Sequence, residues 1–230
     1  MTSAPAGVPH GPHDAAVDLY WLPLGAGGHS VRFNGLIYEA AFALRRGRHP
    51  CALYHSALEV RVPEGRFVIE QTPVPDDDGA TRGVVAGGAV GSRWAGRLRI
   101  FRYELRRWRD GVIPDIAEAV ASPQLLTTDP CRARRLLALT PSVPTLVWGR
   151  DQLDAGEMWN SNSFISWLLE RSGLDAESIH PPAGGRAPGW QAGLVVARRS
   201  RDHVRHVPDG SAFVSPANPG TPGHSSVLPR

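Results

Sequence analysis

Hydrophobic residues follow two different periods along this chain, and together they predict an α+β protein. In residues 51–62 apolar and polar side chains alternate, which is typical of a half-buried strand. A turn at 63–65 should return the chain through residues 66–71, so that the two segments form a hairpin. In residues 163–171 the apolar positions recur instead at helical spacing, and this helix is expected to end at Gly173.

Weaker patterns predict the remaining elements. Strands are expected at 17–24, 83–86 and 193–197, and within 91–110, where a bulge near Ile100 would explain a change in the alternation. Short helices are expected at 36–43 and 114–120. A longer helix should end at Leu139, with Thr128 or Asp129 as its N-cap and Pro130 in its first turn. This order predicts a single domain over residues 16–197, between disordered tails at 1–15 and 198–230.

The composition indicates a globular protein without a membrane span. Hydrophobic residues make up 42% of the 230 residues, but no run reaches the ~18 apolar residues that a span needs. The first residues lack the charged start and apolar core of a secretory signal, and the chain has only two cysteines, so we expect a cytoplasmic protein. No cluster of His, Cys and Asp has metal-ligand spacing, and neither a metal nor a cofactor is expected.

Arginine supplies all 25 basic residues, because the sequence contains no lysine. Seven of them lie between Arg93 and Arg109, interleaved with aromatic residues. This mixture occurs in grooves that bind single-stranded nucleic acid. The preferred interpretation is a half-exposed strand whose guanidinium groups cover apolar neighbours.

Two residue types that nucleophilic catalysis requires stand about a hundred residues apart. His55 lies in the middle of the strand 51–62, and Ser161 lies between two asparagines just before the helix 163–171. A hydroxyl at a helix start faces free backbone N–H groups, which can stabilise an oxyanion. A histidine within hydrogen-bond reach would act as its general base. Cys131, in the first turn of the helix that ends at Leu139, ranks as a distant second nucleophile.

Two short segments carry a resemblance to a known family. The histidine strand, Leu53-Tyr54-His55-Ser56-Ala57-Leu58-Glu59-Val60 followed by Phe67-Val68-Ile69-Glu70, resembles that of the circularly permuted papain-like proteins. Those include the PPPDE peptidases and the lecithin retinol acyltransferase-like branch of the NlpC superfamily. The segment Asn160-Ser161-Asn162-Ser163-Phe164 resembles their Asn-Cys-Asn-x-Phe nucleophile motif.

The resemblance implies a papain/NlpC-like fold, in which an antiparallel sheet packs against a nucleophile-bearing helix. It also implies a thiol hydrolase or acyltransferase site, but Ser161 stands where the family has its cysteine. The family uses a third polar group to orient the histidine. A three-residue hairpin turn would give this role to Gln71, and a four-residue turn would give it to Glu70. The residues expected to line the cleft are Trp159, Asn160, Asn162, Arg186 and Trp190.

Three functions follow from these observations. The first is an amide or ester hydrolase or acyltransferase of low activity, using a Ser161–His55 pair on a peptide or an acyl-bearing small substrate. The second is a non-catalytic descendant of the fold, which binds a peptide, lipid or protein partner in its cleft. A nucleic-acid binder that uses the arginine-rich strand 97–109 ranks behind both.

Overall fold

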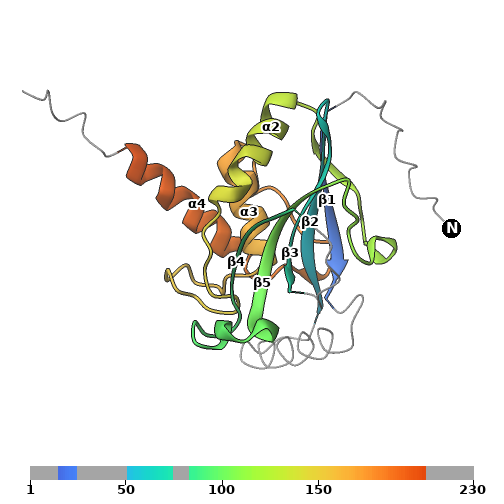
Figure 1. Cartoon of the computed structure of the whole chain (residues 1–230). Coiled ribbons are helices and arrows are strands. Elements are labelled where there is room, and N and C mark those ends of the chain that lie inside the picture. Colours follow the sequence, from blue (N-terminus) through green and yellow to red (C-terminus); the bar gives the residue numbers. More distant parts are fainter. Residues whose placement is uncertain (1–14, 25–50, 75–82, 206–230) are drawn as a thin grey trace, which may run out of the picture.

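The computed structural model describes residues 15–24, 51–74 and 83–205, and for 201–205 it describes the backbone alone. The helix expected at 36–43 lies outside the described residues, as do most of the two expected tails. One antiparallel sheet dominates the described part (Figure 1). Its strands follow the order β4 (Val84–Ala89), β5 (Arg102–Arg109), β3 (Gly65–Pro73), β2 (Ala52–Val62), β1 (Ala16–Pro23) and β6 (Gln124–Thr127).

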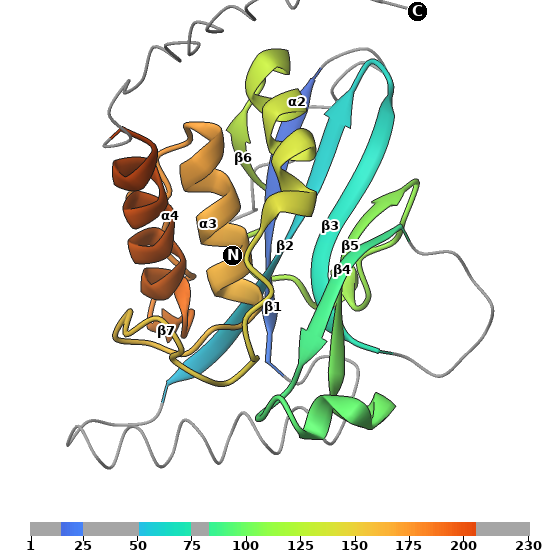
Figure 2. The same ribbon diagram turned by 60° about the vertical axis from the view of Figure 1, so that its left-hand side comes forward.

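The α-helices cover one face of this sheet. Figure 2 shows α2 (Pro130–Leu139), α3 (Ser161–Ser172) and α4 (Trp190–Arg205) on the same side of the strands. A two-residue strand, β7 (Gly185–Arg186), pairs in parallel with the start of β2. The expected α+β class with an antiparallel sheet is therefore confirmed. Among the described residues, no helix combines the length and the apolarity that crossing a membrane requires.

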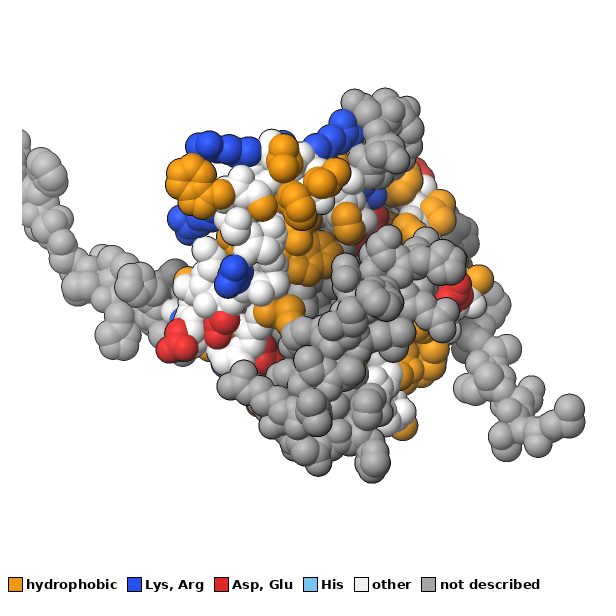
Figure 3. All heavy atoms as spheres, turned by 90° about the horizontal axis from the view of Figure 1, so that it is seen from below, with side chains coloured by type: hydrophobic (Ala, Val, Ile, Leu, Met, Phe, Trp, Pro, Cys, Tyr) orange, Lys and Arg blue, Asp and Glu red, His pale blue; other side chains and the backbone are white. Residues whose placement is uncertain are grey.

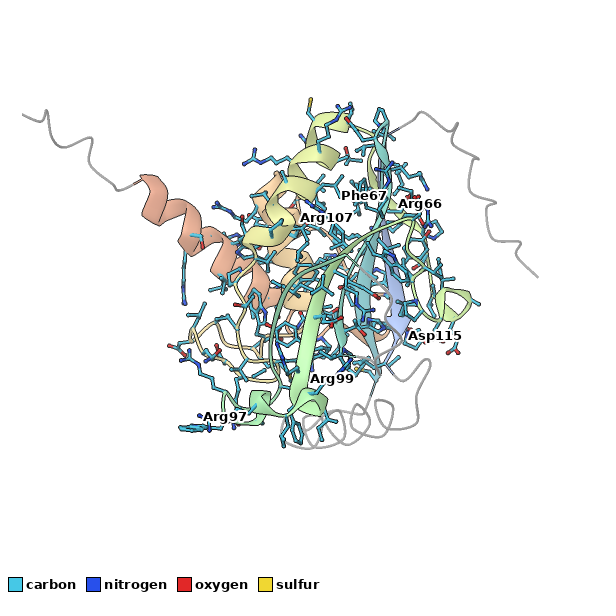
Figure 4. All side chains as sticks on the ribbon, in the orientation of Figure 1. Arg66, Phe67, Arg97, Arg99, Arg107 and Asp115 are labelled. Atoms are coloured by element: carbon cyan, nitrogen blue, oxygen red, sulfur yellow. The ribbon has the colours of Figure 1, made fainter. Side chains whose placement is uncertain are left out.

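Alternation along the strands divides the buried residues into two groups, one on each face of the sheet. On the helix-covered face, Leu58 and Val60 of β2 pack with helix residues such as Phe164 and Leu168 in the main core. On the other face, Ala57 packs with Leu22 and Ile113 in a smaller cluster. Figure 4 shows Asp115, from the segment that covers this second face, on the side of the sheet away from the helices.

Helix α3 begins two residues earlier than predicted, at Ser161, and ends at the predicted glycine, because both of its ends are capped. Asn160 is the N-cap, and its side chain accepts hydrogen bonds from the backbone N–H groups of Asn162 and Ser163. Gly173 ends the helix at φ 87°, a left-handed conformation that glycine adopts without strain. Eleven of the twelve helix residues, all except Arg171, are buried. The predicted Asp129 cap and Pro130 first turn of α2 are also confirmed.

Two predicted elements are wrong, and a third, the arginine-rich strand within 91–110, forms only in its second half as β5. The strand expected at 193–197 belongs to α4, which continues to Arg205 and so crosses the expected start of the tail at 198. Trp190, Leu194 and Ala197 recur at helical spacing and lie in the core beside α3, and this packing outweighs the strand propensity of the short apolar run. Two 3₁₀ turns, η1 (Ala95–Arg97) and η2 (Arg99–Phe101), replace the first half of the expected arginine-rich strand. Only the turn η3 (Ile116–Glu118) forms where the helix 114–120 was expected.

Candidate functional site

His55 and Ser161, the expected base and nucleophile, belong to opposite faces of the sheet. Ser56, the neighbour of His55 on β2, donates a 2.9 Å hydrogen bond from its hydroxyl to Oδ1 of Asn162 on α3. Because successive strand side chains point to opposite faces, His55 points away from α3. The pairing of β1 with β2 agrees, since His55 lies opposite Leu22, a member of the cluster on the far face. The structure therefore does not bring the two residues together.

Three N–H groups in the first turn of α3, those of Asn162, Ser163 and Phe164, are bonded to the cap residue Asn160. Asn160 Oδ1 accepts from the N–H of Asn162 at 2.9 Å and from that of Ser163 at 3.2 Å. The Asn160 carbonyl accepts from the N–H of Phe164 at 3.0 Å. An oxyanion hole needs donors aimed at the developing charge. Here three of the N–H groups near Ser161 are already bonded to the cap residue.

The two asparagines beside Ser161 are buried connectors. The Asn162 amide donates to the carbonyls of Tyr54, at 2.9 Å, and Pro188, at 3.0 Å, and so joins α3 to β2 and to the segment before α4. The Asn160 amide donates to the same Pro188 carbonyl at 2.8 Å. Between them they satisfy buried groups on three separate segments, which is what a buried polar network must do to stabilise a core. The Asn-Ser-Asn-Ser run thus has a structural role that is independent of Ser161.

Serine and glycine residues allow α4 to approach α3 closely. Ser163 donates to the carbonyl of Gly189 at 2.8 Å, and Ser166 donates to that of Trp190 at 2.7 Å. A Cβ on Gly193 would lie 2.0 Å from Ser166 Oγ and 2.2 Å from the Ser163 carbonyl oxygen. Only a residue without a side chain fits at this point, which explains a glycine inside a helix despite its poor helix propensity.

His55 is half-buried and has an environment that suits a neutral imidazole. Burial lowers its pKa from the usual 6.5 to about 4, although the nearby Asp115 carboxylate acts in the opposite direction. A general base works best when its pKa lies near the working pH. With a pKa of about 4, this imidazole is a weak base at neutral pH.

The hairpin turn decides which of the two expected orienting residues shares the face of His55. Val62 pairs with Gly65, so only Pro63 and Glu64 lie between the strands and the three-residue turn is wrong. A two-residue turn has the same parity as a four-residue one and places Glu70 on the His55 face. Gln71 faces the helices instead.

Glu70 is held by an ion pair with a neighbouring strand. Its carboxylate lies 3.2 Å from the guanidinium of Arg106, which also contacts Glu104 at 2.9 Å. Glu70 and Arg106 are both buried and stand opposite each other on β3 and β5. This pairing gives Glu70 a role within the sheet that does not depend on the imidazole.

The residues expected to line a cleft are mostly inside the protein. Trp159 and Trp190 belong to the main core, where the ring of Trp190 lies 5.2 Å from that of Trp21. The indole N–H of Trp190 donates to the carbonyl of Ala176 at 2.9 Å. Arg186 is half-buried with its guanidinium 4.0 Å from Glu157. These positions stabilise the packing of α3 and α4 and leave little of the side chains for a ligand.

Neither metal ligands nor an alternative thiol pair emerges from the geometry. In the parts of the chain that the structure describes, no three His, Cys, Asp or Glu side chains are grouped as metal ligands would be. Cys131 is exposed in the first turn of α2, and its backbone N–H donates to the Asp129 cap at 2.8 Å. His55 points to the face of the sheet away from the helices, whereas Cys131 lies on α2 over the other face, so the sheet separates this thiol from the imidazole as well.

The arginine-rich segment divides into two parts with different roles. In the middle of β5 two arginines contact the protein itself: Arg106 is ion-paired, and Arg107 donates to the carbonyl of Leu137 at 2.9 Å. Residues 90–101, which we call the β4–β5 tip, instead expose large apolar side chains beside arginines. The sequence shows apolar residues between arginines in this segment. Because a half-exposed strand was expected there, the exposure of both kinds of side chain was not predicted.

Comparison of the chain with models of protein families, with curated proteins and with solved structures gives no match. The kinship with permuted papain-like proteins therefore stays a prediction from the two short segments.

Proposed function

We propose that this protein acts by non-covalent binding and performs no chemistry with Ser161 and His55. The single observation that carries the proposal is that these residues lie on opposite sides of the sheet. Ser56 is bonded to α3, and its neighbour His55 therefore points to the other face. A Ser–His pair must lie within hydrogen-bond reach for proton transfer. The bonded state of the α3 N–H groups and the low pKa of His55 both support the same conclusion.

The binding surface that the geometry favours is the β4–β5 tip rather than a cleft beside α3. Trp159, Trp190 and the two asparagines that were expected to line such a cleft are buried in contacts that hold the fold together. The tip carries exposed apolar side chains, and a contiguous exposed apolar surface is a mark of an interaction site. The proposal thus keeps the non-catalytic hypothesis and moves its surface.

A fluorophosphonate probe, which labels activated serines, tests the absence of catalysis. The full chain and a Ser161→Ala variant should both remain unlabelled under conditions in which a serine hydrolase control is labelled. Labelling of the full chain that disappears in Ser161→Ala would overturn the proposal. A Ser142→Ala variant is the control for loss of a serine elsewhere, because this exposed residue ends the short turn η4 (Thr140–Ser142) and belongs to neither expected site.

A further inference from the structure

Four large apolar side chains of the β4–β5 tip are exposed together. The exposed fractions are 75% for Trp94, 59% for Leu98, 78% for Ile100 and 40% for Phe101. Seen from below, hydrophobic side chains gather on this face of the molecule with arginines at their edges (Figure 3). Figure 4 shows Arg97 and Arg99 at the same end of the molecule. Scattered exposed apolar residues are ordinary, but four within eight residues form a patch.

Local hydrogen bonds hold the patch in a defined conformation. The backbone N–H of Leu98 donates to the carbonyl of Ala95 at 2.9 Å, and that of Phe101 donates to the carbonyl of Leu98 at 3.0 Å. Gly91 anchors the base of the tip, because its N–H donates to the carbonyl of Trp148 at 2.8 Å. A tip ordered in this way presents its apolar side chains with little further loss of conformational entropy on binding.

The charge of the tip has one sign. Its exposed arginines are Arg93, Arg97 and Arg99, with Arg102 following directly, and no acidic residue occurs between Gly83 and Tyr103. The guanidinium of Arg97 lies 4.7 Å from the centre of the Trp94 ring, which keeps a positive charge beside an exposed indole. The binding partner should therefore present negative charge at its edge and an apolar interior.

We propose that the β4–β5 tip docks on an anionic lipid surface. This inference rests on the proposed function, because it names the partner of the same surface. Leu98 and Ile100 would enter the boundary between headgroups and acyl chains, Trp94 would lie at the headgroup level, and Arg93 and Arg97 would bind lipid phosphates. Two of the four apolar side chains are aliphatic. Aliphatic side chains are stabilised by entering hydrocarbon, but they offer no flat ring on which a nucleobase could stack. A lipid surface therefore fits these two side chains better than a single-stranded nucleic acid does.

Co-sedimentation of the full chain with vesicles tests the proposal. We expect binding to vesicles of phosphatidylcholine that contain roughly 30% phosphatidylserine, a mole fraction close to that of an anionic leaflet. Vesicles of phosphatidylcholine alone should bind little of the protein. Leu98→Ser with Ile100→Ser should lower the partition coefficient about tenfold or more, because two apolar side chains lose their buried area. Arg93→Gln with Arg97→Gln should lower it by about fivefold per charge at low salt.

Matched variants control for general effects of polarity and charge. Val112→Ser with Ile116→Ser removes two exposed aliphatic side chains outside the tip, and Arg132→Gln with Arg135→Gln removes two exposed charges on α2. Both should leave the partition coefficient within about twofold of the parent value. All substituted positions are exposed, so each variant should keep the thermal midpoint of the parent chain.

Three outcomes would overturn the lipid proposal. The first is the absence of binding to the anionic vesicles, and the second is binding that the α2 charge variant weakens as much as the tip variants do. The third is binding to a thymidine oligonucleotide in preference to the vesicles, together with loss of oligonucleotide binding and vesicle binding when Trp94 is substituted. That pattern would indicate base stacking. None of these results decides the fluorophosphonate experiment, so failure of the lipid assignment and failure of the non-catalytic proposal remain distinguishable.

Discussion

The hydroxyl of Ser56 and the side-chain oxygen of Asn162 are joined by a 2.9 Å hydrogen bond between the centre of the sheet and the start of α3. Both residues are buried, and so a donor or acceptor left without its partner there would be costly. The bond fixes the odd-numbered residues of β2 on the far face of the sheet. A histidine one residue from Ser56 is therefore directed away from the helix that carries Ser161.

Replacement by alanine should destabilise the protein at Asn162 but hardly at Ser161. Asn162→Ala removes the partner of the Ser56 hydroxyl and of two carbonyls, and we expect it to lower the free energy of unfolding by about 2–3 kcal/mol. Ser161→Ala removes none of the side-chain contacts that hold α3 and should change it by no more than about 0.5 kcal/mol. Urea unfolding measures both, and a larger cost for Ser161 would contradict the structural interpretation of the motif.

Gly193→Ala should destabilise the protein although alanine is the better helix former. At an exposed helix position the change would stabilise by about 1 kcal/mol. In α4 the new methyl group would meet Ser166 Oγ and the Ser163 backbone, so we expect a loss of about 2 kcal/mol or more. Thermal and urea unfolding test this, with Gln191→Ala on the exposed side of α4 as the control. A stabilised Gly193→Ala variant would mean that α4 does not lie this close to α3.

The stability of the protein should fall between pH 6.5 and pH 4 because of His55. Its folded-state pKa of about 4 lies below the unfolded value of 6.5, so the unfolded chain binds more protons in this range. Stability is then complete above pH 6.5 and decreases as the pH falls toward 4, by on the order of 2 kcal/mol for a half-buried group.

Replacing His55 by glutamine, which does not titrate, isolates this contribution. Urea unfolding of His55→Gln at a series of pH values should give a flatter profile between pH 4 and 6.5 than the parent chain. An unchanged profile would show that His55 is not the group responsible. His180, which is exposed, supplies the control His180→Gln, and this variant should keep the parent profile.

Gln71→Met should maintain or raise stability. Gln71 is buried opposite Leu105 on the helix-covered face, and among the described residues neither of its amide atoms has a hydrogen-bond partner. A buried amide without partners costs free energy, and methionine has a similar length without this cost. We expect an increase of about 1 kcal/mol in the free energy of unfolding. A loss greater than about 1 kcal/mol would indicate that the amide is bonded in solution, for example to a buried water.

Much of the secondary structure was accessible from the sequence, because the strongest elements carry local signals. The alternation in β2, the capping residues of α2 and α3 and the glycine after α3 are each properties of a few consecutive residues. The errors fall where local propensity and packing compete. The apolar run at 193–197 lies in a helix because the small residues on α3 allow a close helix contact that no local pattern reveals.

The candidate site was only partly accessible for the same reason. The sequence identified the asparagines and serines around the start of α3 as special, and the structure assigns them contacts that hold α3 against β2 and α4. The sequence could not decide whether Glu70 or Gln71 shares the face of His55. One residue more or less in the turn moves every side chain of the following strand to the other face of the sheet. The sequence also could not separate the exposed arginines of the tip from the paired arginines of β5.

The sequence alone determined the α+β class, the positions of the strongest strand and helix and the concentration of arginine in one segment. These features depend on periodicity, on capping and on composition, which are written locally along the chain. Only the tertiary structure decided that His55 and Ser161 face apart and that the β4–β5 tip is exposed. Those outcomes depend on strand register and on which face receives the helices, and both are set by contacts such as Ser56–Asn162 between residues more than a hundred positions apart.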